Sequence, residues 1–112
     1  MFRLVRVLVP LILLLGLAAC SAGDSAEPTT IRLSITGDAP TEPVREEVPL
    51  GSLLTLEVTS EVDGLLHVHG YEEEVELVAG ETTQTTFTAA MAGGFEVETH
   101  DPEAVWLVLV VS

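Results

Sequence analysis

Three histidines are the side chains best suited to chemistry in this 112-residue chain. His67 and His69 are two residues apart. Side chains two apart on a β-strand point to the same face, so a strand here would present both imidazoles together. His100 ends a later stretch of alternating apolar residues, and that end could approach the first two histidines. Neutral imidazoles suit Cu(II), Zn(II) or Ni(II), so we interpret His67, His69 and His100 as candidate ligands of one ion.

Carboxylates near the histidines have two interpretations. Glu98 or Asp101 could accept the second N–H of a ligating imidazole and thereby orient the ring. The acidic run of Glu72, Glu73, Glu74 and Glu76 is either a cation site or, as we favour, a solvated edge that discourages edge-to-edge pairing of strands. An ion held by imidazoles should be lost below about pH 5–6, because the ordinary pKa of an imidazole is about 6.5.

Short strands are the elements that must position these residues. Alternating apolar and polar residues, separated by turn signals such as Asp63-Gly64, predict strands but no helix of any length. The expected strands cover residues 30–36, 44–48, 54–58, 65–71, 72–78, 82–89, 95–98 and 104–111. This pattern predicts an all-β protein with a Greek-key β-sandwich. The last strand is apolar at nearly every position, which predicts burial on both faces.

Alternation within the strands also predicts which side chains form the core. One face of each strand should be apolar and point inward. The predicted core residues are Ile31, Leu33, Ile35, Leu54, Leu56, Val58, Leu66, Val68, Phe87, Phe95, Val97, Trp106, Val108 and Val110.

The N-terminal segment predicts export. Arg3 and Arg6 are followed by an apolar run at residues 4–17, which is shorter than the roughly 20 residues that span a bilayer. The run ends in Leu-Ala-Ala before Cys20, the only cysteine, and this ending resembles a bacterial lipoprotein lipobox. The resemblance implies cleavage before Cys20, a lipid on its sulfur and acylation of its new amino group. The alternative is an ordinary secretory signal with a chance cysteine.

Three segments follow from this interpretation. Residues 1–19 are the expected signal peptide, residues 20–29 the lipidated cysteine with a flexible tether, and residues 30–112 a single folded domain. A tether of about nine residues reaches roughly 15–18 Å. The expected location is therefore the outer face of the cell membrane, with the lipid on Cys20 as the membrane contact.

The charge excludes one class of partner. Loss of the signal removes Arg3 and Arg6 and leaves Arg32 and Arg45 against 18 acidic side chains. Such a surface repels phosphates, which excludes nucleic-acid binding and attachment to anionic lipids through a basic patch.

Residues 51–112 resemble the cupredoxin fold family. A strand carries His-Val-His-Gly-Tyr at residues 67–71, a stretch at residues 78–89 matches the family's Pro-Gly-Glu and Phe-Thr-Ala pattern, and residues 93–98 match its Gly-x-Tyr-x-Tyr-x run. The His-x-His-Gly-Tyr stretch is also similar to that of actinobacterial cupredoxin-like lipoproteins. The resemblance implies a sandwich of the blue-copper type.

The metal-binding residues of blue-copper proteins do not match as well. Thr99 stands where the family resemblance would place the copper-binding cysteine, His100 follows without the usual gap, and Met91 precedes the run. A threonine supplies no thiolate, so a type-1 copper centre and its fast electron transfer are not expected.

Three hypotheses for function follow. The favoured one is a non-catalytic, lipid-anchored binding module for Cu(II), Zn(II) or another divalent ion. The second is an accessory module that binds another envelope protein without metal. The third, a copper enzyme, would need an open coordination position in a pocket, for which a domain covering residues 30–112 leaves little room. We expect no enzyme, because the sequence carries no Gly-x-Ser-x-Gly motif and no phosphate-binding loop.

Overall fold

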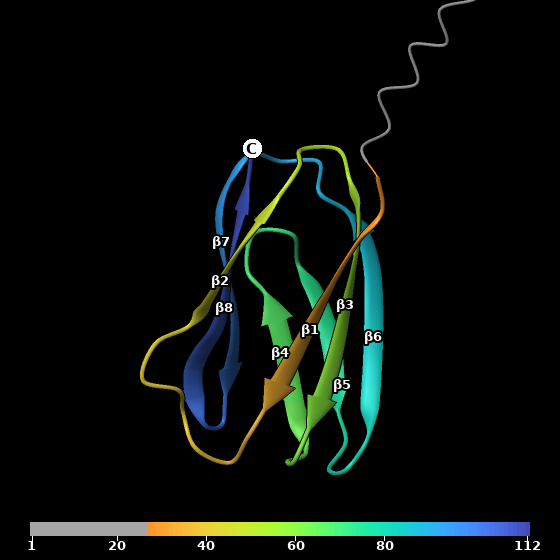
Figure 1. The fold of residues 1–112 in the computed structure, drawn as a ribbon. Helices are drawn as coiled ribbons and strands as arrows, with labels where there is room; N and C mark the ends of the chain where they lie inside the picture. Colours follow the sequence, from red (N-terminus) through yellow and green to blue (C-terminus); the bar gives the residue numbers. More distant parts are fainter. Residues whose placement is uncertain (1–26) are drawn as a thin grey trace, which may run out of the picture.

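The computed structural model describes residues 27–112, which form two β-sheets packed face to face (Figure 1). The predicted signal peptide and Cys20 lie outside these residues. No helix capable of crossing a bilayer occurs within the described part. The strands are β1 (Thr29–Ile35), β2 (Val44–Val48), β3 (Leu53–Ser60), β4 (Gly64–Val68), β5 (Glu73–Leu77), β6 (Thr82–Thr88), β7 (Gly93–His100) and β8 (Glu103–Val111).

The two sheets share the strands unequally. One sheet has the order β1-β3-β6 and the other the order β2-β8-β7-β4-β5, so the chain passes between sheets several times. Two pairs, β1 with β3 and β2 with β8, are parallel, and all other pairs are antiparallel. The sequence prediction of an all-β sandwich is confirmed.

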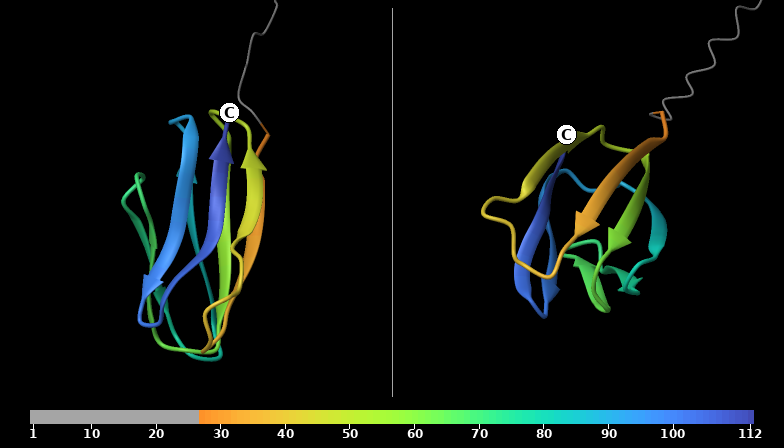
Figure 2. Two further views of the ribbon diagram at one scale, coloured as in Figure 1. Left: turned by 90° about the vertical axis from the view of Figure 1, so that its left-hand side faces the viewer. Right: turned by 60° about the horizontal axis from the view of Figure 1, so that its bottom comes forward.

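The strands run along the length of the sandwich, which gives it two distinct ends (Figure 2). The start of β1 and the C-terminus lie at one end, together with the β2–β3 and β6–β7 loops (Figure 1). The connections β1–β2, β3–β4, β5–β6 and β7–β8 lie at the other end (Figure 1).

The core lies between the sheets and is almost entirely aliphatic. Alternation correctly predicted its members on β1, β3 and β4, where every second side chain is buried. The buried apolar residues are Ile31, Leu33, Ile35, Val48, Leu54, Leu56, Val58, Leu66, Val68, Val75, Leu77, Phe87, Ala89, Val97, Trp106, Leu107, Leu109 and Val111. Phe95 is half-buried and packs against this core.

The prediction for the last strand was wrong in register. Val97 pairs with Leu107 but Glu98 pairs with Val105, so Trp106 is an extra residue that forms a β-bulge in β8. A bulge places two consecutive side chains on one face, and both Trp106 and Leu107 are buried.

The residues after the bulge therefore face opposite to expectation. Leu109 and Val111 point into the core, whereas Val108 and Val110 are half-buried on the outer face. Burial of β8 on both faces was also wrong, because only its inner face is fully covered.

Candidate metal centre

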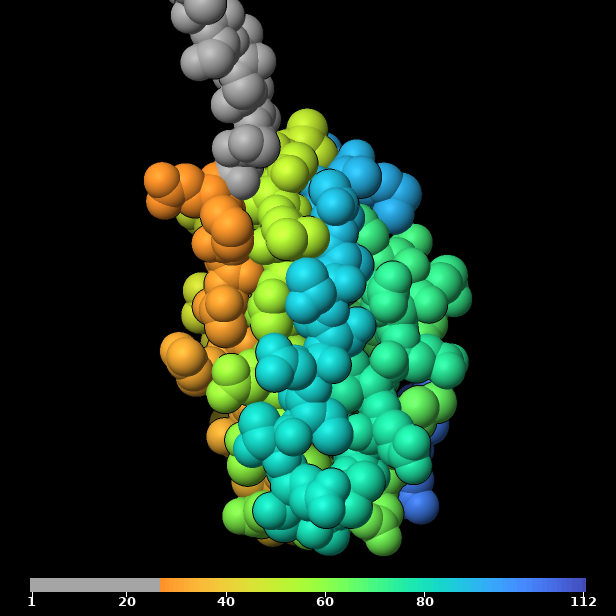
Figure 3. All heavy atoms as spheres, turned by 90° about the vertical axis from the view of Figure 1, so that its right-hand side faces the viewer, coloured from red at the N-terminus to blue at the C-terminus, as the bar shows by residue number. Residues whose placement is uncertain are grey.

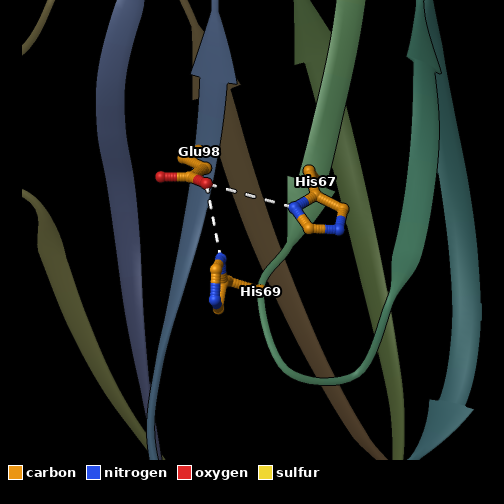
Figure 4. Close-up of side chains that lie close together, drawn as sticks. All are labelled: His67, His69 and Glu98. Atoms are coloured by element: carbon orange, nitrogen blue, oxygen red, sulfur yellow. Dashed lines mark ion pairs between the residues drawn. The ribbon is translucent and has the colours of Figure 1, made fainter.

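Two of the predicted histidines meet a glutamate on the outer face of the five-stranded sheet (Figure 4). Pairing of β4 with β7 places His67 directly opposite Glu98, and their neighbours Val68 and Val97 point into the core. His69 follows the end of β4 and continues the ladder, because its backbone N–H donates to the carbonyl of Glu96 at 2.9 Å.

The three side chains direct potential ligand atoms at one point. One such atom from each of His67, His69 and Glu98 lies within 4.8 Å of the others. The Nδ1 atoms of His67 and His69 lie 4.0 and 3.6 Å from the same oxygen, Oε1 of Glu98. Ligands held about 2.0–2.1 Å from a tetrahedral ion are about 3.3 Å apart, so small side-chain movements would suffice to bind one.

A second carboxylate contacts the far side of the His67 ring. Nε2 of His67 lies 3.1 Å from Oε2 of Glu72. This hydrogen bond is the main reason why the pKa of Glu72 is lowered from its ordinary value, and a hydrogen bond from the backbone of Gly70 adds to the effect. Carboxylates in this position orient metal-binding imidazoles and raise their basicity.

The turn between β4 and β5 holds Glu72 in reach of His67. Gly70 has φ of +92°, and a Cβ at this position would lie 2.7 Å from the ring of Phe95, so only glycine fits. Tyr71 fixes the turn from the other side, since its ring packs against Phe87 and Phe95 and its hydroxyl donates to the carbonyl of Met91.

His100 is not part of this group. It is exposed at the end of β7, where it pairs with Glu103. On the paired strands β7 and β4, Glu96 lies beside His69 and Glu98 lies beside His67. His100 is two residues beyond Glu98, on the side away from His69. Four residues along a strand correspond to about 13 Å. The structure thus brings together His67, His69 and Glu98, and His100 does not belong to this group.

Thr99 contributes no ligand to this group, and Met91 is exposed in the loop between β6 and β7. The Thr99 side chain is buried inside the sandwich, where its hydroxyl donates to the carbonyl of Pro102 and accepts from Nε1 of Trp106 at 2.9 Å. The position expected for a copper thiolate is therefore occupied by a hydroxyl that is fully hydrogen-bonded within the core. The residues present do not fit a type-1 copper centre.

The cluster is open to solvent on one side. The side chains of His67 and Glu98 are 18% and 23% exposed, and that of His69 is 69% exposed. Residues 27–112 enclose no pocket. An ion bound here would keep coordination positions for water or for another molecule.

The sequence predicts that Glu98 only orients a ligand and that Glu72 belongs to a solvated edge, whereas the structure places Glu98 in the cluster and Glu72 on the ring of His67. The missing information was the register between β4 and β7, which no local pattern specifies. The sequence does carry one signal for the cluster. His67 and His69 are two residues apart, as are Glu96 and Glu98, so each pair shares one face of its strand.

Replacement of Glu72 by glutamine is expected to weaken binding of a divalent ion by about 10–100-fold, the usual effect of losing an outer-shell carboxylate. The amide keeps the shape but cannot draw the proton of His67 Nε2 as strongly. Glu76→Gln is the matched control, because it removes the same charge from β5 at a position that pairs with Leu65 and not with His67. Equal affinities of the two variants in a Cu(II) titration would contradict a role for Glu72.

Comparisons with known proteins support the fold. The sequence matches no protein-family model, and no curated protein matches it. Its structure is similar to a chain of a heme-copper terminal oxidase dimer, with a TM-score of 0.60, 17% identity and coverage of 83% of this chain and 68% of the other. It is also similar to a mutant of the laccase from B. aclada, with a TM-score of 0.59, 15% identity and 79% of this chain covered.

A third similar structure is the blue copper oxidase from Nitrosomonas europaea, with a TM-score of 0.55, 18% identity and 78% of this chain covered. This chain spans only 23% of the laccase and 39% of the blue copper oxidase. A mutant of amicyanin has a TM-score of 0.50 at 15% identity, with coverage of 74% of this chain and 82% of the other. The fold is thus a cupredoxin-like β-sandwich.

Proposed function

We propose that this protein is a lipid-anchored, extracytoplasmic binding module that holds one divalent metal ion, preferably Cu(II), and catalyses no reaction. The observation that carries the proposal is the convergence of two imidazole Nδ1 atoms on one carboxylate oxygen, in the cluster of His67, His69 and Glu98.

The donor set favours copper over zinc. Two imidazoles and one carboxylate are ligands for first-row metal ions, and such sites bind Cu(II) more tightly than Zn(II). Two neutral imidazoles and one negative carboxylate would leave a divalent ion with a net positive charge at an otherwise acidic surface. Copper is also the metal in the names of the similar heme-copper and blue copper oxidases.

The ligands of this cluster favour ion binding over electron transfer. With the soft thiolate position taken by Thr99, no residue between 27 and 112 supplies the ligand that gives blue-copper sites their fast electron transfer. An open site half-exposed to solvent suits the capture or release of an ion.

Titration of tag-free protein, purified from its native membrane, with Cu(II) and Zn(II) tests the proposal. We expect one ion per chain and tighter binding of Cu(II). An acidic protein binds cations weakly at many positions, so a shallow isotherm with several ions per chain would contradict a defined site. In that case, the alternative of a metal-free module that binds another envelope protein would gain support.

A further inference from the structure

We propose that one end of the sandwich is a membrane-contact surface, which rests on the lipid bilayer and fixes the orientation of the domain. This surface, here named the apolar end, consists of the β2–β3 loop, the β6–β7 loop and the first residue of β3. The proposal depends on the membrane anchoring in the proposed function, and it is independent of metal binding.

Backbone hydrogen bonds hold the two loops of the apolar end together. The N–H of Gly51 donates to the carbonyl of Ala89 at 2.8 Å, and the N–H of Ala89 donates to the carbonyl of Ser52 at 2.9 Å. Both loops lie at the same end as residue 27, where the described chain begins (Figure 3). The two joined loops therefore lie beside the start of the described chain.

Large apolar side chains are exposed on the apolar end. Leu50, Leu53 and Met91 are 49%, 46% and 44% exposed, and they supply three of the five large apolar residues that the described part exposes. Leu53 precedes the buried Leu54 and so points away from the core. Residues 27–112 leave about half of each of these side chains uncovered.

Charge is distributed unequally between the two ends. Neither the loop at residues 49–52 nor the loop at residues 89–92 contains a charged side chain. The charges near them are the C-terminal carboxylate of Ser112, Glu27 at the start of the described chain, and Glu72, which follows the Tyr71 that hydrogen-bonds to Met91. The connections at the opposite end carry Asp38, Glu42, Glu61, Asp63, Glu81, Asp101 and Glu103.

This asymmetry suits a bilayer as the partner. The eight residues of β3 correspond to a strand about 26 Å long, which is roughly three Debye lengths at physiological ionic strength. With the apolar end on the membrane, the acidic connections would be screened from anionic headgroups, whereas the reverse orientation would press them together.

The chain preceding residue 27 places the membrane at this end. β1 begins here at Thr29, and Cys20 is separated from it by a short tether. A tether of this length reaches roughly 15–18 Å, so the apolar end must stay near the lipid surface. Tethering raises the local concentration, so three half-exposed side chains suffice for a contact too weak to form alone.

Site-directed fluorescence tests the orientation. The full chain is expressed in its native host with Met91→Cys or Leu65→Cys, labelled on the introduced thiol and reconstituted into phosphatidylethanolamine–phosphatidylglycerol vesicles containing a headgroup-level quencher. Leu65 is the matched control, because it is 46% exposed on β4, away from the tether. We expect several-fold stronger quenching of the label at residue 91 than of the label at residue 65.

A second pair of variants removes any effect of the label itself. Leu53→Glu, placed in the chain labelled at residue 91, should release the contact and lower the quenching to the level of residue 65. Leu65→Glu, placed in the same labelled chain, adds the same charge and should leave the quenching unchanged. Both side chains are half-exposed, so the thermal unfolding temperature should change little.

Three results would overturn the proposal. Equal weak quenching at both positions would show that the domain floats freely on its tether. Protection of residue 91 in whole membranes but not in lipid vesicles would show that a protein covers the apolar end. A wild-type chain whose Cys20 is labelled would show that the lipid anchor is absent, a failure that mass spectrometry detects separately from a failure of the contact.

Discussion

Replacement of His67 by alanine is expected to lower the affinity of the chain for Cu(II) by about 100-fold or more, because loss of an outer-shell partner alone costs about 10–100-fold. His67 is the centre of the cluster, since its Nδ1 faces Glu98 and its Nε2 faces Glu72. Alanine removes a ligand and leaves Glu72 without an imidazole to orient. Calorimetric titration with Cu(II) at neutral pH measures the change.

His100→Ala is the matched control for this experiment. It removes an imidazole from the same sheet, but His100 lies outside the cluster of His67, His69 and Glu98. We expect its affinity for Cu(II) to equal that of the wild type. A loss of affinity in His100→Ala as large as in His67→Ala would favour the three-histidine site predicted from sequence and contradict the cluster seen in the structure.

Replacement of Leu107 by alanine is expected to destabilise the domain by about 2–5 kcal/mol, the usual cost of a large cavity in a core. The Leu107 side chain is fully buried, directly after the β-bulge at Trp106. A domain of this size has a total stability of about 5–15 kcal/mol at most, so this single substitution removes a large part of it. Urea denaturation followed by fluorescence of the single tryptophan measures the loss.

Val108→Ala is the comparison that tests the bulge. Without the bulge, Val108 would point into the core and Leu107 would face outward. With it, Val108 is half-buried on the outer face, and its truncation should cost about 1 kcal/mol or less. The register assigned to β8 would be wrong if Val108→Ala destabilised the domain more than Leu107→Ala.

The fold was accessible from sequence because local patterns specify it. Strands alternate in hydrophobicity with a period of two, and the inward faces of β1 and β3 could be assigned residue by residue. Turn residues such as Asp63-Gly64 marked where the chain reverses. A uniformly apolar strand such as β8 carries no alternation, so its inward face could not be assigned, and a bulge shifted it by one residue.

The sequence by itself determined that His67 and His69 share a face, because their spacing is local, and that residues 27–112 contain no cysteine for a blue-copper site. Only the tertiary structure decided the third member of the cluster. Pairing of β4 with β7 joins residues about thirty apart in the chain, and a shift of two residues in that ladder would have placed His100 beside His67 in place of Glu98. Register between distant strands depends on the packing of the whole core, and no short stretch of sequence encodes it.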